Sequence, residues 1–348
     1  MLPAGTFNET YGQDTAVIRT PLQWLMTILG CIFLLAVPLF AGYYVTYLIN
    51  YVAITIIAVM GLQFVMGYCG LVSFGQVAFM AVGAYSSSIL TISYGWPFWA
   101  SLPASGLIAG LIGILGGSPA LRIKGFYLAL ATLAIHYIVI WLVMELEITG
   151  GSTGLHPPSP TLGNFVLNTD GRMYYIIVPT MIVMTYFAKN LTRSRVGRAF
   201  VVIRDNDLAA GAIGINIFFY KLLAFFIACF YAGIAGSLYA HWVQVVHPDQ
   251  FLLTESLFFV GMLIIGGLGS IVGVFFGSIL VRLLNEGVLF AVPALGAAFP
   301  ALPSHPAASI SVSIFALIII LFLIFEPRGL AHRWEIFKAS YRLYPFSY

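Results

Sequence analysis

Residues 43–66 read YYVTYLINYVAITIIAVMGLQFVM, an apolar run of membrane-spanning length that contains no charged residue. Runs of about 20 apolar residues, enough to cross roughly 30 Å of hydrocarbon, recur along the whole chain. Hydrophobic residues make up 61% of the sequence and charged residues only 8%, whereas soluble domains carry about 25% charged residues. These observations predict an all-α polytopic membrane protein.

Breaks at glycine, proline and charged residues divide the chain into about ten predicted transmembrane helices. The predicted spans are residues 22–40, 43–66, 71–92, 96–116, 126–145, 173–188, 222–241, 254–267, 270–290 and 309–326. The stretch 254–290 is divided only by the sequence GGLGS at 266–270. If this stretch formed one span and a half-helix, the chain would have one span fewer, so both counts stay open.

Lysine and arginine indicate the orientation, because they are enriched in the cytoplasmic loops of membrane proteins. With alternating spans and a cytoplasmic N-terminus, 13 of the 15 Lys and Arg residues fall on the cytoplasmic face. We therefore expect cytoplasmic N- and C-termini. The predicted organisation is a cytoplasmic segment 1–20, a transmembrane domain 21–327 with an outer loop 146–172 and a cytoplasmic loop 189–221, and a cytoplasmic tail 328–348.

The stretch 67–85, GYCGLVSFGQVAFMAVGAY, is unusual for a lipid-facing helix because Gly, Ser and Gln recur in it. Irregular backbone at membrane depth is tolerated only against protein or a water-filled cavity. We predict a kinked or interrupted helix near Ser73–Gln76 and close packing at Gly83. The residues expected to line a polar path are Gln63, Ser73, Gly75, Gln76, Thr132 and His136. His136 has an alternative interpretation as a buried packing residue.

Small residues recur every four positions in two of the predicted spans. One series is Gly269, Gly273 and Gly277, and the other is Ala232, Gly236 and Ala240. Small residues at this spacing let helices approach closely, so we expect the two series to build the helix bundle or a dimer.

Arg282 and Glu286 are ionisable residues inside a predicted span, four positions apart on one helix face. Ionisable residues within the membrane are functional candidates by default. We interpret Arg282 and Glu286 as an intramembrane ion pair that neutralises itself. The alternative is a functional pair that faces a cavity or a neighbouring subunit.

The cytoplasmic loop contains a second distinctive segment. Asp205, Asn206 and Asp207 form a natural N-cap cluster, after which Leu208 begins a short helix that Gly214 can end. Such a helix is suited to docking against a partner. The alternative is a solvated loop that its arginines hold to anionic headgroups.

Motifs for catalysis are missing from the sequence. It contains no G-x-x-x-x-G-K-[ST] loop for a nucleotide, and its six His residues lack the spacing of a metal site. We therefore predict a chain that is not an enzyme, holds no metal or cofactor of its own and binds no nucleic acid.

Several stretches together resemble the branched-chain amino-acid (Liv-type) permease family of ABC importers, in its M-type subunit. The sequence LAAGAIG at 208–214 is similar to the E-A-A-x-x-x-G signature of ABC-importer permeases, with Leu208 in place of the Glu. The other matching stretches are 67–85, LRIKGFYLALATLA at 121–134, ITGGSTGL at 148–155, RSRVGRAFVVIRDNDLAAGAIGIN at 193–216, GGLGSIVG at 266–273 and EPRGL at 326–330.

The resemblance implies a permease subunit in the inner membrane of a prokaryote, moving branched-chain or other amino acids. It implies a second permease subunit, with a heterodimer favoured, two ATP-binding subunits that hold the ATP, and an extracytoplasmic substrate-binding protein. The residues implied in coupling to the ATPase are Arg204, Asp205, Asn206, Asp207, Leu208, Ala209, Ala210 and Gly214. Those implied in contact with the binding protein are Gly150, Gly151, Ser152, Thr153 and Gly154.

Three departures from the family pattern bear on these implications. Leu208 removes an acidic residue whose role Asp205 or Asp207 could take. Phe126 stands where many members of the family have a small polar or acidic residue. His136 is also atypical for the family and points to a different substrate. The alternatives are a urea or short-amide permease of the same family, an ion-coupled secondary transporter, which the scarcity of intramembrane acids disfavours, and a passive channel, for which no filter-like segment is evident.

Overall fold

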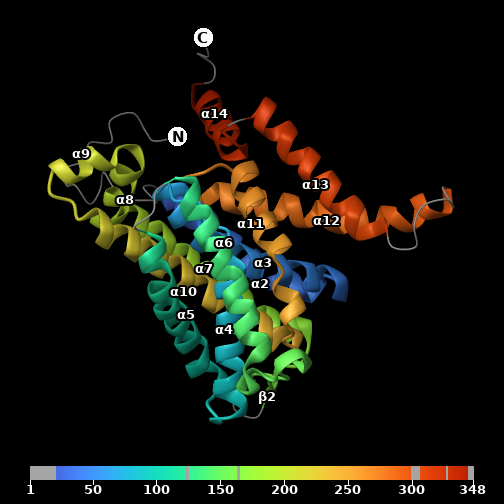
Figure 1. Ribbon diagram of the computed structural model, residues 1–348. Coiled ribbons are helices and arrows are strands. Elements are labelled where there is room, and N and C mark those ends of the chain that lie inside the picture. Colours follow the sequence, from blue (N-terminus) through green and yellow to red (C-terminus); the bar gives the residue numbers. More distant parts are fainter. Residues whose placement is uncertain (1–20, 122–124, 163–164, 299–305, 327, 344–348) are drawn as a thin grey trace.

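The computed structural model describes residues 21–121, 125–162, 165–298, 306–326 and 328–343 (Figure 1). A helix occupies each of the predicted spans. These helices are α2 (Pro21–Phe40), α3 (Tyr43–Gln63), α4 (Gln76–Ile92), α5 (Phe98–Ala120), α6 (Phe126–Glu145), α7 (Asp170–Arg193), α10 (Ile217–Val243), α11 (Leu253–Gly266), α12 (Ile271–Ala298) and α13 (Pro306–Phe325). The predicted cytoplasmic segment 1–20 and the end of the tail, 344–348, lie outside the described residues.

Shorter elements connect these helices. They are the π-helical turn η1 (Phe64–Tyr68), the 3₁₀ turns η2 (Glu147–Thr149), η3 (Gly151–Thr153) and η4 (Pro248–Phe251), strands β1 (Thr161–Leu162) and β2 (Phe165–Val166), and helices α8 (Arg195–Asp205), α9 (Asp207–Ala212) and α14 (Leu330–Leu343). β1 and β2 pair antiparallel, with Thr161 opposite Val166. Within the described ranges the remaining residues form loops and irregular segments between the helices.

Six helical segments within the described residues are long and apolar enough to cross a membrane. They are Tyr43–Tyr68, Phe98–Ala120, Phe126–Glu145, Ile217–Val243, Pro248–Gly266 and Ile271–Val288. Shorter apolar helices cover Trp24–Phe40, Gln76–Ile92 and Ser313–Phe322. A polytopic all-α membrane protein is therefore confirmed, while the number of spans and the orientation stay predictions.

α3 is the central helix of the bundle. In the most apolar part of the segment Tyr43–Tyr68, 78% of the residues are buried by the rest of the protein. α3 contacts α7, α10, α12, α11 and α4. A helix that is apolar all round is stable only when other helices surround it or lipid does. The neighbours of α3 supply that environment, and its polar residues Thr46, Asn50, Thr55 and Gln63 are buried.

Glycines set the closest helix crossings. A Cβ atom added to Gly83 of α4 would overlap the backbone of Gly233 in α10, and one added to Gly236 would overlap the carbonyl of Met80. The predicted close packing of Gly83 is thus confirmed. Gly277 of α12 lies equally close to the carbonyl of Met262 in α11, so the two series of small residues build the bundle itself.

The helix predicted at 71–92 begins later, at Gln76, because the chain between η1 and α4 is irregular. Gly70 has a φ of +72°, a conformation that glycine adopts without strain. The amide of Phe74 donates to Thr132 Oγ1 at 3.0 Å, and the amide of Leu71 donates to the carbonyl of Val65 at 2.9 Å. These bonds satisfy backbone groups that the missing helical turns leave free, and the predicted interruption is confirmed.

The bundle has two distinct ends (Figure 1). The α8–α9 hairpin and α14 lie at one end, here called the hairpin end. The loop that carries β1 and β2 lies at the opposite end, here called the loop end. The α11–α12 connection is at the hairpin end, where the chain turns between the two helices at Gly267–Ser270.

Candidate functional site

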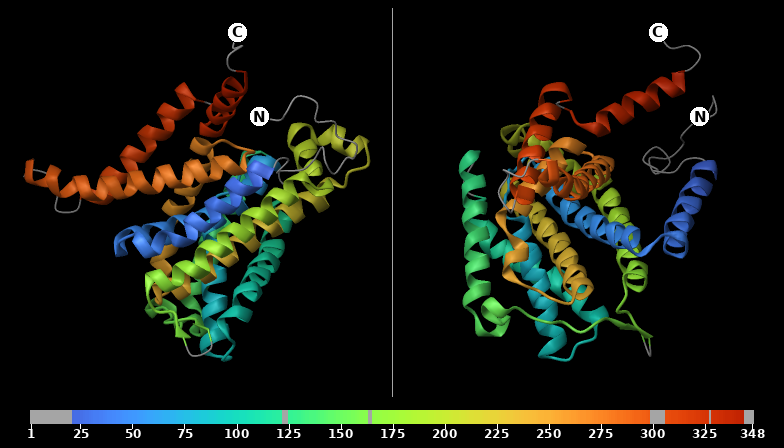
Figure 2. Two further views of the ribbon diagram at one scale, coloured as in Figure 1. Left: turned by 180° about the vertical axis from the view of Figure 1, so that it is seen from behind. Right: turned by 90° about the vertical axis from the view of Figure 1, so that its right-hand side faces the viewer.

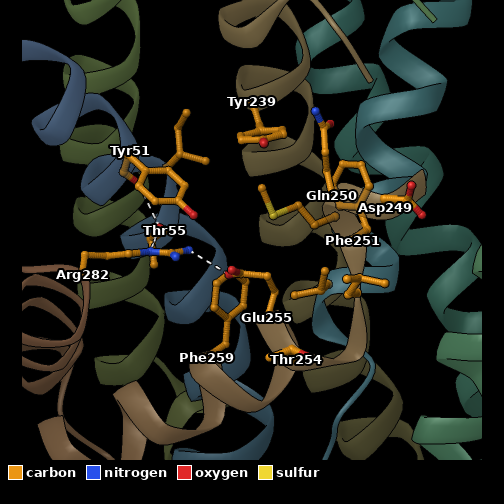
Figure 3. Close-up of a pocket in the computed structure, with 14 residues that line it drawn as sticks. Tyr51, Thr55, Tyr239, Asp249, Gln250, Phe251, Thr254, Glu255, Phe259 and Arg282 are labelled. Carbon is orange, nitrogen blue, oxygen red and sulfur yellow. Dashed lines mark hydrogen bonds and ion pairs between the residues drawn. The ribbon is translucent and has the colours of Figure 1, made fainter. Parts of the chain in front are cut away.

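A cavity of about 470 Å³ opens among α3, α4, α10, η4, α11 and α12 (Figure 3). Its lining divides into polar and apolar groups. The polar residues are Tyr51, Thr55, Tyr239, Asp249, Gln250, Thr254, Glu255 and Arg282, and the others are Ile54, Val77, Met80, Phe251, Leu252 and Phe259. Small-molecule sites combine apolar surface with converging polar groups, and this cavity contains both.

Arg282 of α12 is the charged centre of this cavity. Its side chain is 3% exposed, and Nη2 lies 3.1 Å from Glu255 Oε2 of α11. Nε donates to Thr55 Oγ1 at 3.1 Å, and the guanidinium lies 4.0 Å from the ring centroid of Tyr51. A buried charge is tolerated when it is paired and hydrogen-bonded, and all three partners meet that need.

The predicted ion pair between Arg282 and Glu286 is wrong. The carboxylate of Glu286 accepts a hydrogen bond from the Tyr44 hydroxyl at 2.8 Å, while Arg282 pairs with Glu255. The four-residue spacing permits an intrahelical pair, but Arg282 turns toward α3 and α11, where an aromatic ring and a hydroxyl also receive it.

The α8–α9 hairpin is ordered by side-chain caps. Asn206 Oδ1 accepts hydrogen bonds from the amides of Leu208 and Ala209, and Ser194 caps α8 in the same way. Gly214, with a φ of +85°, follows α9. The short helix therefore starts and ends where the sequence predicts, and it presents Leu208, which is 78% exposed.

Arg204 at the end of α8 connects the hairpin to the interrupted segment. Its Nη1 donates to the carbonyl of Gly67 at 3.0 Å, and its side chain leaves no room for a Cβ on Gly70. Asp205 holds the same guanidinium from the solvent side at 2.9 Å. A displacement of α8 would therefore act directly on the backbone of η1 and on Gly70, which follows it.

The turn between α11 and α12 contacts the end of α3, next to the place where Arg204 binds. Gln63 Nε2 donates to the carbonyls of Gly267, at 3.3 Å, and Ser270, at 3.0 Å. Gly267 also packs against Gly329, which has a φ of +75°. Beyond it, the Arg333 side chain donates to the Glu326 carboxylate.

The junction, defined as residues 67–70, 204, 267–270 and 328–331, brings together four of the stretches that resemble Liv-type permeases. The chain matches the family described as "Branched-chain amino acid transport system / permease component" over residues 44–324, which is more than half of its length. The chain belongs to this permease family. Membrane subunits of the family are transport components and not enzymes.

Curated relatives agree with this assignment. The permease is 34% identical over 258 residues to the high-affinity branched-chain amino acid transport system permease protein LivM of Escherichia coli, an alignment that covers 67% of this chain and 61% of the relative. The same values hold for LivM of Salmonella typhimurium. A probable LivM of Methanocaldococcus jannaschii is 25% identical over 78% of this chain and 88% of its own. The permease thus aligns with less than two thirds of the two bacterial relatives, and no solved structure matches it.

The predicted path residues on the central helices have structural hydrogen bonds. Gln76 is 3% exposed and donates to the carbonyls of Ala58 and Ala228 at 2.9 and 3.0 Å. Ser73 Oγ lies 3.5 Å from the amide of Gly75. Like Gln63, these residues brace the junction or the core, and none of them lines the cavity around Arg282. Their role in a path stays a prediction.

Thr132 and His136 lie on the buried face of α6. Thr132 Oγ1 accepts from Phe74 and donates to the carbonyl of Ala129 at 2.9 Å. His136 is 1% exposed, and its Nδ1 has no hydrogen-bond partner among the described residues. Neither residue lines the cavity, so α6 contributes to the wall of the interrupted segment instead.

The predicted binding-protein loop is at the loop end. Gly150, Gly151 and Gly154 all have positive φ, and Leu155 forms an isolated antiparallel bridge with Val246 just before η4. Thr153 Oγ1 donates to the carbonyl of Gly150 at 2.6 Å, whereas the side chain of Ser152 lies outside the described residues. The loop therefore packs beside η4, which borders the cavity.

Arg282 is the one residue of this cavity that the sequence analysis singled out, and Glu255, Tyr51 and Tyr239 are among those that it missed. Glu255 lies in the first turn of α11, so it reads as a solvated residue at the edge of a span. The sequence did contain one indication of this pair: Glu255 lies near the start of one apolar helix, and Arg282 is the one arginine inside the next. No cluster of three or more metal-ligating side chains occurs in the described part of the chain.

Proposed function

We propose that this permease is the transmembrane subunit of an ATP-driven importer for branched-chain or other amino acids. It pairs with a second permease subunit and two ATP-binding subunits and receives its substrate from an extracytoplasmic binding protein. The observation that supports this proposal most is the α8–α9 hairpin. It is a capped, exposed element, and Arg204 connects it by a hydrogen bond to the backbone of the interrupted segment.

The names of the relatives support an amino-acid substrate and a permease pair. This chain also aligns with a probable LivH of Methanocaldococcus jannaschii, 25% identical over 63% of this chain and 71% of the relative. Proteins named LivM and LivH in one organism therefore both resemble it, which supports a permease pair. A heterodimer in the inner membrane of a prokaryote, with ten spans, cytoplasmic termini and ATP held only by the partner subunits, is part of the proposal.

The test is uptake by reconstituted transporter. The permease is purified with its genomic partner subunits, placed in proteoliposomes with ATP inside, and supplied with binding protein and labelled L-leucine. We expect uptake that requires ATP and the binding protein and that persists when an ionophore collapses ion gradients.

Two results would contradict the proposal. Uptake without the ATP-binding subunits that is abolished by the ionophore would identify an ion-coupled transporter. ATP-dependent uptake of urea or acetamide, with none of leucine, isoleucine or valine, would keep the importer but replace its substrate class.

A further inference from the structure

The cavity around Arg282 combines an ion pair with an apolar lining. Arg282 and Glu255 lie together beside Tyr51 and Phe259, and Asp249, a second acid, lies near Phe251 (Figure 3). The apolar lining includes Ile54, Met80 and Phe251. The cavity volume of about 470 Å³ is within the range of pockets that hold small molecules. A ligand that suits this hollow carries charge at one end and hydrocarbon at the other.

The ion pair leaves hydrogen-bonding capacity unused. Arg282 uses Nε for Thr55 and Nη2 for Glu255, and Nη1 has no hydrogen bond to a described residue. An arginine fork binds a carboxylate best through two parallel N–H groups, whereas here a single guanidinium nitrogen approaches one carboxylate oxygen. Both members of the pair can therefore exchange their partner for groups on a ligand.

The cavity reaches the surface at the loop end. Asp249 of η4 lines it and has a side chain that is 71% exposed, with Oδ2 at 3.2 Å from His247 Nδ1. The predicted binding-protein loop packs beside η4 through the Leu155–Val246 bridge. An entrance at this position faces the side from which a binding protein would deliver its cargo.

We propose that this cavity is a binding site for the zwitterion of an aliphatic amino acid, with Arg282 on the α-carboxylate, Glu255 on the α-ammonium group and apolar residues of the lining around the side chain. The pair is neutral when the site is empty, and the bound zwitterion adds no net charge. The site thus avoids an uncompensated buried charge in either state, which would be costly. The inference rests on the proposed function, because it names the substrate site of the same importer.

Ligand binding by the purified permease alone tests the site without ATP. Thermal unfolding in detergent is followed with L-leucine, with leucinamide, which lacks the carboxylate, and with 4-methylpentanoate, which lacks the ammonium group. We expect stabilisation by leucine only. Replacing both charges, Arg282→Met with Glu255→Met, leaves no unpaired ion and should abolish this stabilisation, while Glu286→Gln on the same helix keeps it.

Uptake supplies a second readout. In complete transporters, the double variant should lower leucine uptake by roughly tenfold to a hundredfold, the usual effect of losing charge-assisted hydrogen bonds, while ATP hydrolysis stimulated by the binding protein stays within twofold. Arg282→Lys, which keeps the charge but loses the fork, should give an intermediate loss.

The inference is overturned if leucine does not stabilise the wild-type permease, if leucinamide stabilises it equally, or if the double variant binds and transports normally. Failure of the proposed function looks different: leucine binds the wild-type cavity, but ATP drives no uptake.

Discussion

Gly236 lies where α10 crosses α4. A Cβ atom at this position would overlap the carbonyl oxygen of Met80, so only glycine fits. Gly287 of α12 is a useful contrast, because a Cβ added there meets nothing within 4 Å. The two glycines therefore differ in what they do: Gly236 is required for the close approach of two helices, whereas the packing around Gly287 does not require a glycine.

Substituting these two glycines should separate the roles. Gly236→Ala forces α4 and α10 apart and should destabilise the protein by about 1–3 kcal/mol, the typical range for overpacking. Gly287→Ala should be neutral or slightly stabilising, because alanine favours the helix. Thermal unfolding in detergent measures both; an unchanged midpoint for Gly236→Ala would show that the crossing is looser than described.

Arg204 offers a second residue-scale prediction, because it donates to Gly67 from outside the interrupted segment. Arg204→Glu should place an acceptor against that carbonyl and lower leucine uptake per ATP hydrolysed several-fold. Arg195→Glu makes the same charge change at an exposed position of the same helix and serves as the control. Equal losses in both variants would attribute the effect to charge and not to the Arg204–Gly67 bond.

Residue-scale prediction from the sequence succeeded where the cause is local. The Asn206 cap and the positive φ of Gly214 follow from side-chain and backbone preferences within a few residues. The partner of Arg282 did not follow, because Glu255 lies 27 positions away and only the packing of α11 against α12 brings the two together. Long-range partners depend on helix rotation, which apolar helices without a marked amphipathic face do not reveal.

At the scale of elements, α9 is a helix of six residues, too short to be stable by itself. Its persistence depends on the cap and on packing against α8. Asn206→Ala should cost about 1 kcal/mol of local stability, as for other N-caps.

Hydrogen–deuterium exchange checks this expectation. The amides of Leu208 and Ala209 should exchange faster in Asn206→Ala, with α8 unaffected. Asn216→Ala removes the corresponding cap from α10 and should speed exchange at Phe219 only. Faster exchange at α9 in both variants would mean that the hairpin melts as one unit with the start of α10.

The interruption before α4 shows how far element boundaries can be predicted. Gly70, Ser73 and Gly75 indicate that a helix breaks, and the break is present. They do not indicate that helix formation waits until Gln76, because that depends on Thr132 of α6 accepting the Phe74 amide. In the same way, GGLGS predicted a division between α11 and α12 but could not decide the count of spans.

At the scale of the whole molecule, the hairpin and the 150–154 loop lie at opposite ends of the bundle (Figure 2). The proposed orientation places these ends on opposite sides of the membrane. In a background with Cys31 replaced by serine, Thr153→Cys should react with a membrane-impermeant maleimide added outside spheroplasts. Leu208→Cys should react only after the membrane is opened; labelling of both from outside would refute the topology.

The junction at the hairpin end exists only in the folded molecule. Residues near 67, 204, 267 and 328 are distant in sequence, and their similarity to one family said nothing about their contact. Their convergence explains why these motifs are rich in glycine and include an arginine. The turns after η1 and α11, the segment before α14 and the Arg204 guanidinium pack closely together here.

The pairing of Arg282 with Glu255 also has a consequence for biosynthesis. An arginine near the centre of a span costs about 2.5–3.5 kcal/mol during insertion by the translocon, and α11, which carries Glu255, leaves the ribosome immediately before α12. The two helices pack through Gly266, Gly273 and Gly277, so they can enter the bilayer as a preassembled pair in which the charges have already met.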